Sequence, residues 1–433
     1  MMSLIVVGAI VLAIALGYKT RINIGLFAIA FAYLIGCFAM GMSPNEVIKL
    51  WPLKIFFIIF SVSLFYSFAI INGTLEKLSE HLLYSCRKFP HFLPFAIFFS
   101  STLISALGAG YYTVLAFMAP LTLLVCQRTG MSMIVGAMSV NYGALAGANF
   151  VSSQSGIIFR TLMMGAGFSE EDAFINALGI FISTAVIPLL VITGLVFLTG
   201  HAKTMKESGF SIDKPRAFDS KQKTTLTLTL VMMLLVLAAP ISAILMPDNE
   251  TITFINSKIN IGLVASIFSV LALMLKLGDE RKAIASLPWS TLIMICGVGM
   301  LISIAIKAGA IDQLSSWIGT NIPSALVPVA FGVVGALMSL FASTLGVVTP
   351  ALFPIVPSIA ANLGIDPMII FICIVVGAQA TSISPFSSGG SLILGACPSD
   401  ENRRDLFPQL LFRAAPLGFA VALLYNLAIT FVL

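Results

Sequence analysis

The sequence predicts an all-helical protein that crosses a membrane many times and is built from two inverted copies of one unit. Of its 433 residues, 59% are hydrophobic and only 9% are charged, and its mean hydropathy is +1.06. A soluble domain carries about 25% charged residues, so lipid must be the main solvent of this chain. Two further observations, broken apolar segments and an internal repeat, predict the rest of the fold.

Ten apolar runs are long enough to cross a membrane, since one crossing takes roughly 20 apolar residues. They lie at about 2–18, 23–42, 53–72, 131–166, 174–199, 224–246, 252–275, 289–306, 367–397 and 407–431. The first run lacks a preceding basic segment and a small-residue cleavage motif. We therefore expect it to be a retained crossing rather than a signal peptide.

Four apolar segments are interrupted. The stretches 92–127 and 322–362 break near the middle, which leaves arms of roughly 13–15 residues, or about 20 Å of helix. Such arms are too short for a hydrocarbon core of ~30 Å, so we expect two re-entrant hairpins. The runs 131–166 and 367–397 contain clusters of Gly, Ser, Asn and Pro, which form helices poorly and predict two broken helices.

An internal duplication relates the two halves. Four collinear matches recur at shifts of 234–238 residues: Arg21-Ile-Asn-Ile-Gly-Leu26 with Lys258-Ile-Asn-Ile-Gly-Leu263, Pro52 with Pro288, Ser105-Ala-Leu-Gly108 with Ser343-Thr-Leu-Gly346, and Gly143-Ala144 with Gly377-Ala378. Such collinearity indicates two repeats, at 1–199 and 224–433, joined by a linker at 200–223. Five crossings separate the first matched pair, and an odd number inverts the second copy.

The basic residues predict the orientation. Seventeen lie on one predicted face: Lys19, Arg21, Lys77, Arg87, Lys88, Arg128, Lys203, Lys206, Lys214, Arg216, Lys221, Lys223, Lys276, Arg281, Lys282, Arg403 and Arg404. The other face holds four, Lys49, Lys54, Lys258 and Lys307. Because basic loops stay in the cytoplasm, we expect a bacterial inner-membrane protein with a cytoplasmic linker and both termini in the periplasm.

The distribution of titratable groups excludes several functions. His81, His91 and His201 and all 18 acidic residues fall outside the predicted crossings. Enzymes, metal transporters and carboxylate-driven proton pumps in membranes need such groups at membrane depth, and the six Cys show no ligand spacing. We therefore expect no enzyme, no cofactor and no protein metal cluster. The basic residues form no patch, so we expect no nucleic-acid partner.

The four interruptions carry the candidate binding site. Unwound segments at membrane depth line cavities, and the helix N-termini beside them favour anions. The candidate substrate-binding residues are Ser105, Gly108, Gly110, Asn149, Ser152, Ser153, Gln154, Ser155, Ser343, Thr344, Gly346, Ser384, Ser387, Ser388 and Gly389. Backbone carbonyls near Gly110, Gly147, Gly346 and Thr381 could hold Na⁺. The competing interpretation is that these small residues only allow close helix packing.

Arg160 is a basic residue deep in an apolar run. One interpretation makes it a partner for a substrate carboxylate. The other has it reach the periplasmic surface with its long side chain.

These motifs resemble a known group of transporters. The hairpins, broken helices and inverted repeat are similar to the ion-transporter superfamily that contains the divalent anion/sodium symporters. Ser105-Ala-Leu-Gly-Ala-Gly110, Ala148-Asn-Phe-Val-Ser-Ser-Gln-Ser-Gly-Ile-Ile158, Val375-Val-Gly-Ala378 and Ser384-Pro-Phe-Ser-Ser-Gly389 resemble the MatC-like malonate/dicarboxylate carriers. The resemblance implies an elevator mechanism and a homodimer. It also implies Ser-Asn-Thr at both tips, where this chain has Gly110-Tyr-Tyr112 and Gly346-Val-Val348.

The sequence thus favours a secondary transporter of a small organic anion, such as malonate or a C4 dicarboxylate, with Na⁺ as the candidate coupling ion. An uncoupled anion facilitator or channel is the alternative, and a sensor or non-transporting subunit is a third reading.

The predicted topology can be tested with reporter fusions. A fusion at residue 210 should report a cytoplasmic location and one at residue 433 a periplasmic location, because an odd number of crossings separates the repeats. The same location for both fusions would contradict the inverted repeat.

Overall fold

The residues described by the computed structural model are 2–85, 92–198, 214–246, 249–339 and 343–432, and their regular structure is helical, with no strand among them. The predicted all-helical membrane fold is therefore confirmed.

The first half contains α1 (Met2–Thr20), α2 (Ile24–Tyr33), η1 (Leu34–Ala39), α3 (Pro44–Ile48), α4 (Leu53–Ile71), α5 (Thr74–Ser85), α6 (Leu93–Ile104), η3 (Ser105–Ala109), α7 (Tyr111–Thr129), α8 (Met133–Ala148), α9 (Gln154–Gly165) and α10 (Glu170–Leu198). The second half contains α12 (Ser220–Leu245), α13 (Glu250–Lys258), α14 (Ile261–Met274), α15 (Glu280–Ala285), α16 (Trp289–Lys307), α17 (Ala310–Asn321), η4 (Ser324–Leu326), α18 (Val327–Ser339), η5 (Thr344–Val348), α19 (Thr349–Leu352), η6 (Phe353–Ile355), α20 (Val356–Leu363), α21 (Pro367–Ala380), α22 (Ser388–Gly395), α23 (Asp400–Gln409), η7 (Leu410–Ala414) and α24 (Ala415–Val432).

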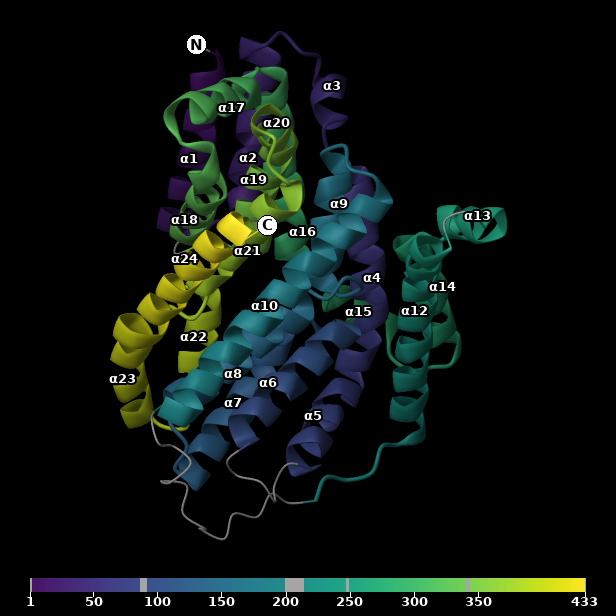
Figure 1. Cartoon of the computed structure of the whole chain (residues 1–433). Helices are drawn as coiled ribbons and strands as arrows, with labels where there is room; N and C mark the ends of the chain where they lie inside the picture. The colour runs from purple at the N-terminus through teal and green to yellow at the C-terminus, as the bar shows by residue number, and fades with distance from the viewer. Residues whose placement is uncertain (1, 86–91, 199–213, 247–248, 340–342, 433) are drawn as a thin grey trace.

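The two halves are arranged in opposite senses. In Figure 1, α5 and the hairpin α6–α7 lie in the lower part of the molecule, whereas α17 and the hairpin α18–α20 lie in the upper part. Equivalent helices exchange partners between the halves, since α2 packs on α16 and α14 packs on α4. The hairpins thus enter the fold from opposite ends.

The repeated motifs begin equivalent helices. Asn23 and Asn260 are the N-cap residues of α2 and α14, and their side-chain oxygens accept hydrogen bonds from Gly25 N (2.9 Å) and Gly262 N (3.0 Å). Pro52 precedes α4 as Pro288 precedes α16. These caps satisfy backbone N–H groups that a helix start leaves without partners.

A matched pair of glycines places each hairpin on its broken helix. A Cβ atom on Gly143 of α8 would lie 2.5 Å from Phe98 O in α6, and one on Gly377 of α21 would lie 2.0 Å from Gly332 O in α18. Small residues let helix backbones approach closely in membranes. The Gly143–Gly377 repeat therefore fixes the same contact twice.

Both predicted broken helices occur. The first is α8 and α9 with an unwound segment at 149–153, and the second is α21 and α22 with an unwound segment at 381–387. By length and composition, six described helices can cross a membrane, or seven if the bent pair α13–α14 counts once. The sequence predicted ten crossings. Four predicted crossings are not counted, because the apolar parts of α1, α2, α8 and α21 have only 10–17 residues. The predicted run 252–275 is counted only as the bent pair, and Thr344–Leu363, which was expected to be part of a hairpin, is counted as a crossing.

Three expected boundaries differ. The run 252–275 is bent by 67° between α13 and α14, because Ile259 is extended and Asn260 caps a new helix. The hairpin arms are not all short. Helix α7 has 19 residues because it starts at Tyr111 and continues to Thr129, and the segment Thr344–Leu363 has 20 because it joins the tip segment η5 to the arm that follows it. The linker ends before Ser220, where α12 begins, and its residues 200–213 lie outside the described part of the chain.

Candidate functional site

The hairpin tips and the helix breaks surround two adjoining hollows. The first is lined by Val62, Ser63, Tyr66, Ser67, Ile70, Gly108, Ala109, Tyr111, Tyr112, Thr113, Gln154, Ser286, Pro288, Thr291, Ser343 and Leu345. The second is lined by Tyr111, Tyr112, Leu145, Ser155, Ser339, Ser343, Thr344, Leu345, Gln379, Ser382, Ser387, Ser388 and Gly389. Four residues line both hollows, so we describe them together as the central cavity.

Four helical segments begin at the central cavity. Tyr111 starts α7, Gln154 starts α9, Ser388 starts α22 and Thr344 starts η5, and all four residues line the cavity. The first N–H groups of a helix lack partners within it and carry the positive end of its dipole. The cavity is therefore surrounded by four electropositive backbone ends.

The cavity lining, as far as the structure describes it, carries no formally charged side chain. The polar lining residues are hydroxyl and amide side chains, and the remainder are apolar or Gly. Any charge on a ligand would therefore be balanced by backbone dipoles and hydroxyl groups.

The first tip is held between α4 and the first break. Gly108 has φ +99°, and a Cβ atom there would lie 2.2 Å from the Tyr66 ring. The Tyr66 hydroxyl donates to Ser152 O at 3.1 Å. A residue with a side chain would meet both a strained φ and a clash at position 108.

Serine hydroxyls tie this tip to the first broken helix. Ser105 Oγ donates to Ala144 O (2.8 Å), and Ser153 Oγ donates to Ser105 O (2.6 Å). Ser105, Ser152 and Ser153 are fully buried. The hydroxyl protons of Ser105 and Ser153 are therefore already used in hydrogen bonds within the protein, and both residues lie behind the cavity wall.

An amide pair joins the two broken helices. Asn149 Nδ2 donates to Gln379 Oε1 at 2.9 Å, and Gln379 Nε2 donates back to Asn149 Oδ1 at 3.0 Å. Asn149 Nδ2 also donates to Thr184 Oγ1 at 3.0 Å. Asn149 is fully buried and Gln379 nearly so, so this pair fixes the end of α8 against the end of α21.

A second chain of hydrogen bonds runs from the first tip to the second break. The Tyr111 hydroxyl donates to Asn141 Oδ1 at 2.6 Å, and Asn141 Nδ2 donates to Ser382 Oγ at 2.9 Å. Gly389 lies against Tyr111, since a Cβ atom there would lie 1.8 Å from the Tyr111 hydroxyl oxygen. Tyr111 therefore fixes the position of the first tip relative to α22.

The second break and second tip are capped by their own serines. Ser387 Oγ accepts from Gly390 N (3.1 Å) and donates to Ser384 O (2.8 Å). Ser343 Oγ accepts from Gly346 N at 3.2 Å, and Ser339 and Thr344 hydroxyls lie 3.2 Å apart. These bonds hold the N-termini of α22 and η5 at the cavity wall.

The structure brings together most of the residues predicted from the breaks. Eight of them line the central cavity: Gly108, Gln154, Ser155, Ser343, Thr344, Ser387, Ser388 and Gly389. The others lie behind it or beside it: Ser105, Gly110, Asn149, Ser152, Ser153, Gly346 and Ser384. Gly110 adjoins Gln154, and Gly346 packs on Met294.

Three of the four carbonyls considered for Na⁺ already accept backbone hydrogen bonds. Gly110 O accepts from Val114 N (3.1 Å), Gly147 O from Phe150 N (3.1 Å) and Thr381 O from Ser384 N (3.0 Å). Gly147 also lies inside α8 rather than in the break. A cation at these positions would have to use the second lone pair of each oxygen.

Arg160 lies outside the central cavity. Its guanidinium contacts Glu170 and Val151 and lies 5.2 Å from the centre of the Phe174 ring. Its side chain is only 7% exposed. It therefore neither lines the predicted site nor reaches the surface as the competing interpretation expected.

Sequence reasoning overlooked several residues that build this site. Tyr111 and Tyr112 follow the glycines of the first tip, and this adjacency is a usable signal. Tyr66 and Asn141 lie inside apolar helices away from the breaks, whereas Gln379 lies near the end of α21, just before the second break. A polar residue in such a helix carries a signal of its own, since it needs a partner.

The chain is similar to two transporter family models and to one solved transporter structure. The family model described as "Dicarboxylate carrier protein MatC N-terminus" matches residues 1–148, and the model described as "Citrate transporter" matches residues 251–432. The crystal structure of the Alcanivorax borkumensis YdaH transporter, reported to have an unusual topology, has the same fold. It aligns with a TM-score of 0.58 at 17% identity over 93% of this chain and 89% of that chain. No curated protein sequence matches the chain.

The fold and the matched families define a multi-pass membrane carrier and not an enzyme. The chain is similar to the dicarboxylate-carrier model over residues 1–148 and to the citrate-transporter model over residues 251–432.

The amide pair gives a test of how the broken helices are joined. Asn149→Leu should lower the free energy of unfolding of the detergent-solubilised protein by about 1–3 kcal/mol, because it leaves the buried Gln379 amide without its partner. Gln379→Leu should do the same. The double variant should recover about 0.5–3 kcal/mol relative to the sum of the single losses.

The control is Asn321→Leu, which removes an exposed amide on α17 and should change stability little. Strictly additive losses at positions 149 and 379 would contradict the pairing.

Proposed function

We propose that this protein is an elevator-type secondary transporter of a small organic anion, most simply a dicarboxylate such as malonate or a C4 acid. The single observation that carries the proposal is the convergence of four helix N-termini on a cavity whose described lining has no charged side chain. Such an arrangement attracts anions without a fixed cationic group that would hold them permanently.

The number of helix ends suits a dianion. Each N-terminus acts as roughly half a positive charge, so four of them supply about two charges. Free N–H groups and the hydroxyls of Ser155 and Ser388 can donate to carboxylate oxygens. The matched models are described by dicarboxylate and citrate transport, which supports the same class of cargo.

The proposed moving unit comprises both hairpins and both broken helices. It packs against the crossed pairs α2–α16 and α14–α4, which we propose as the static scaffold and as the site of a homodimer contact. A shift of the moving unit against this scaffold would carry the central cavity from one side of the inner membrane to the other.

Na⁺ is the proposed coupling ion, because hard cations take oxygen ligands and the described cavity lining offers hydroxyl, amide and carbonyl oxygens. The alternative is an uncoupled facilitator or channel, favoured by the three carbonyls that already accept hydrogen bonds.

Transport by purified protein in proteoliposomes tests the proposal. With radiolabelled malonate at fixed pH, an inward Na⁺ gradient should drive accumulation above the external concentration, and replacing Na⁺ with K⁺ or choline should abolish it. Equilibration without accumulation in all three salts would indicate a facilitator. No uptake of malonate, succinate or citrate in any salt would overturn the proposed cargo.

A matched pair of variants tests the central cavity. Ser388→Leu places a branched apolar side chain at the N-terminus of α22 and should lower the malonate transport rate at least about tenfold, which corresponds to about 1.4 kcal/mol. Ser391→Leu changes the same helix at an exposed position that does not line the cavity. Its rate should stay within about twofold of the unmodified protein, and an equal loss in both variants would mean that the change only disturbs α22.

A further inference from the structure

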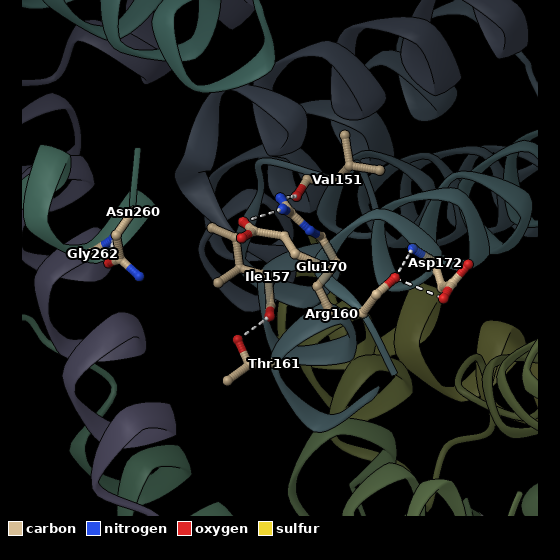
Figure 2. Close-up of polar contacts among 9 residues, drawn as sticks. Val151, Ile157, Arg160, Thr161, Glu170, Asp172, Asn260 and Gly262 are labelled. Atoms are coloured by element: carbon tan, nitrogen blue, oxygen red, sulfur yellow. Dashed lines mark hydrogen bonds and ion pairs between the residues drawn. The ribbon is translucent and has the colours of Figure 1, made fainter. Parts of the chain in front are cut away.

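A second polar pocket lies apart from the central cavity, between α9 and the scaffold helices α4 and α14. Its polar lining residues are Lys54, Arg160, Thr161, Glu170 and Asn260, and none of them lines the central cavity. Figure 2 shows Arg160 reaching Val151 and Glu170, with Asn260 on the other side of the pocket. By the distribution of basic residues, this pocket belongs to the predicted periplasmic side.

The Arg160 guanidinium is poorly satisfied for a buried cation. Its contacts with Glu170 Oε1 and Val151 O are both long, at 3.4 Å. Its Nε has no hydrogen-bond partner in the described part of the chain. A guanidinium offers five N–H donors, and a buried charge with so few good bonds is costly. The pocket therefore has donor capacity left for a further acceptor.

The repeat shows that this pocket is a departure from the symmetry of the fold. In the equivalent crossing of the other half, Asn23 Nδ2 donates to Ser290 O (2.8 Å) and Ser290 Oγ (3.1 Å), which closes the contact between α2 and α16. Ser290 corresponds to Lys54, since each stands two residues after the matched proline. Asn260 corresponds to Asn23, and among the described residues its Nδ2 has no such partner.

We propose that this pocket is a second anion site, which binds a single carboxylate group between Arg160, Lys54 and Asn260. The two cationic side chains and the one carboxylate of Glu170 leave a net charge of one positive unit, which suits one carboxylate. The planar guanidinium matches the carboxylate geometry, and the Asn260 amide supplies an uncharged donor. Thr161 does not contribute a proton, because its hydroxyl donates to Ile157 O at 2.7 Å.

The pocket is connected to the first helix break. Arg160 donates to Val151 O, and Val151 lies in the unwound segment 149–153 next to Ser152 and Ser153. Glu170 begins α10, and half of its side chain is exposed. A carboxylate that competes with Glu170 for Arg160 would therefore bind close to the backbone that supports the central cavity.

The pocket can be probed without any transport. Met164 lines it and carries no charge, so Met164→Cys introduces a thiol without removing a proposed ligand. Modification at position 164 is followed by mass spectrometry in phosphatidylcholine nanodiscs, with a sulfonate-bearing and a trimethylammonium-bearing methanethiosulfonate. The measured quantity is the rate of modification by the sulfonate reagent divided by the rate of modification by the trimethylammonium reagent. This ratio should be at least about tenfold higher at position 164 than at Trp317→Cys, an exposed position on α17.

Removal of either cation should reduce this preference. We expect the ratio of sulfonate to trimethylammonium modification rates at position 164 to fall at least threefold in Lys54→Gln and in Arg160→Gln. Lys54 is exposed, so its replacement leaves the core intact. Lys258→Gln is the matched control, because it removes the same charge from the same predicted face and does not line the pocket. An equal effect of Lys258→Gln would overturn the site in favour of a general surface potential.

Competition identifies the ligand. Acetate and malonate should slow the sulfonate reagent at position 164, with saturation, more than potassium chloride does at the same ionic strength. Equal slowing by chloride would mean screening only and would overturn the proposal. So would blocking by phosphatidylglycerol in the nanodisc with no further effect of acetate, because the ligand would then be a lipid phosphate. The inference uses the proposed function only in choosing malonate, and protection by acetate would sustain it even if malonate were not transported.

Discussion

Backbone N–H and C=O groups that leave a helix at membrane depth must find partners within the protein or line a cavity, and this constraint governs both halves of the molecule. The segments 149–153 and 381–387 are unwound. Backbone carbonyls in these segments and at the neighbouring first tip accept hydrogen bonds from uncharged side chains. Ser153 donates to Ser105 O, Tyr66 donates to Ser152 O, and Ser387 donates to Ser384 O. The helix N-termini at the central cavity keep further N–H groups for a ligand, because Ser387 and Ser343 each accept from only one N–H group at the starts of α22 and η5. The binding capacity of the site is thus a consequence of how its breaks are stabilised.

The helix contacts within the two repeats are equivalent, whereas the residues that connect the repeats at the site occur only once. The glycines at 143 and 377 make equivalent contacts in the two halves, as do the asparagine caps at 23 and 260. The Asn149–Gln379 pair has no such counterpart, since the positions equivalent to them at the shift of 234 are Ile383 and Leu145. If the same amide residue stood at equivalent positions of the two repeats, the two halves would make the same contact twice. Because Asn149 and Gln379 stand at positions that are not equivalent, their pairing holds the two breaks in one defined arrangement around the cavity.

The sequence predicted the positions of the hairpins and breaks because Gly, Ser and Pro clusters disrupt helices locally. The tips at 105–109 and 344–348 and both breaks appear where those clusters lie. Local composition could not reveal which serines face the cavity. Ser105 and Ser153 are buried by hydrogen bonds to partners 39 and 48 residues away in sequence, so their orientation depends on packing. Arg160 illustrates the same limit, because its environment is set by Glu170 and Phe174, which the pattern of apolar runs placed in the following loop and at the start of the next crossing.

An uncharged cavity also limits how pH can act on transport. No His, Asp or Glu lines the central cavity within the described residues, so protonation of the cargo is the direct route by which pH changes its charge. A dicarboxylate that gains a proton loses about half of its attraction to the helix ends, each of which acts as roughly half a charge. For the proposed dicarboxylate cargo, the dianion is then the favoured form. A tricarboxylate carries a third charge that this set of helix ends does not balance, so the same cavity disfavours it unless a proton or a cation enters with it.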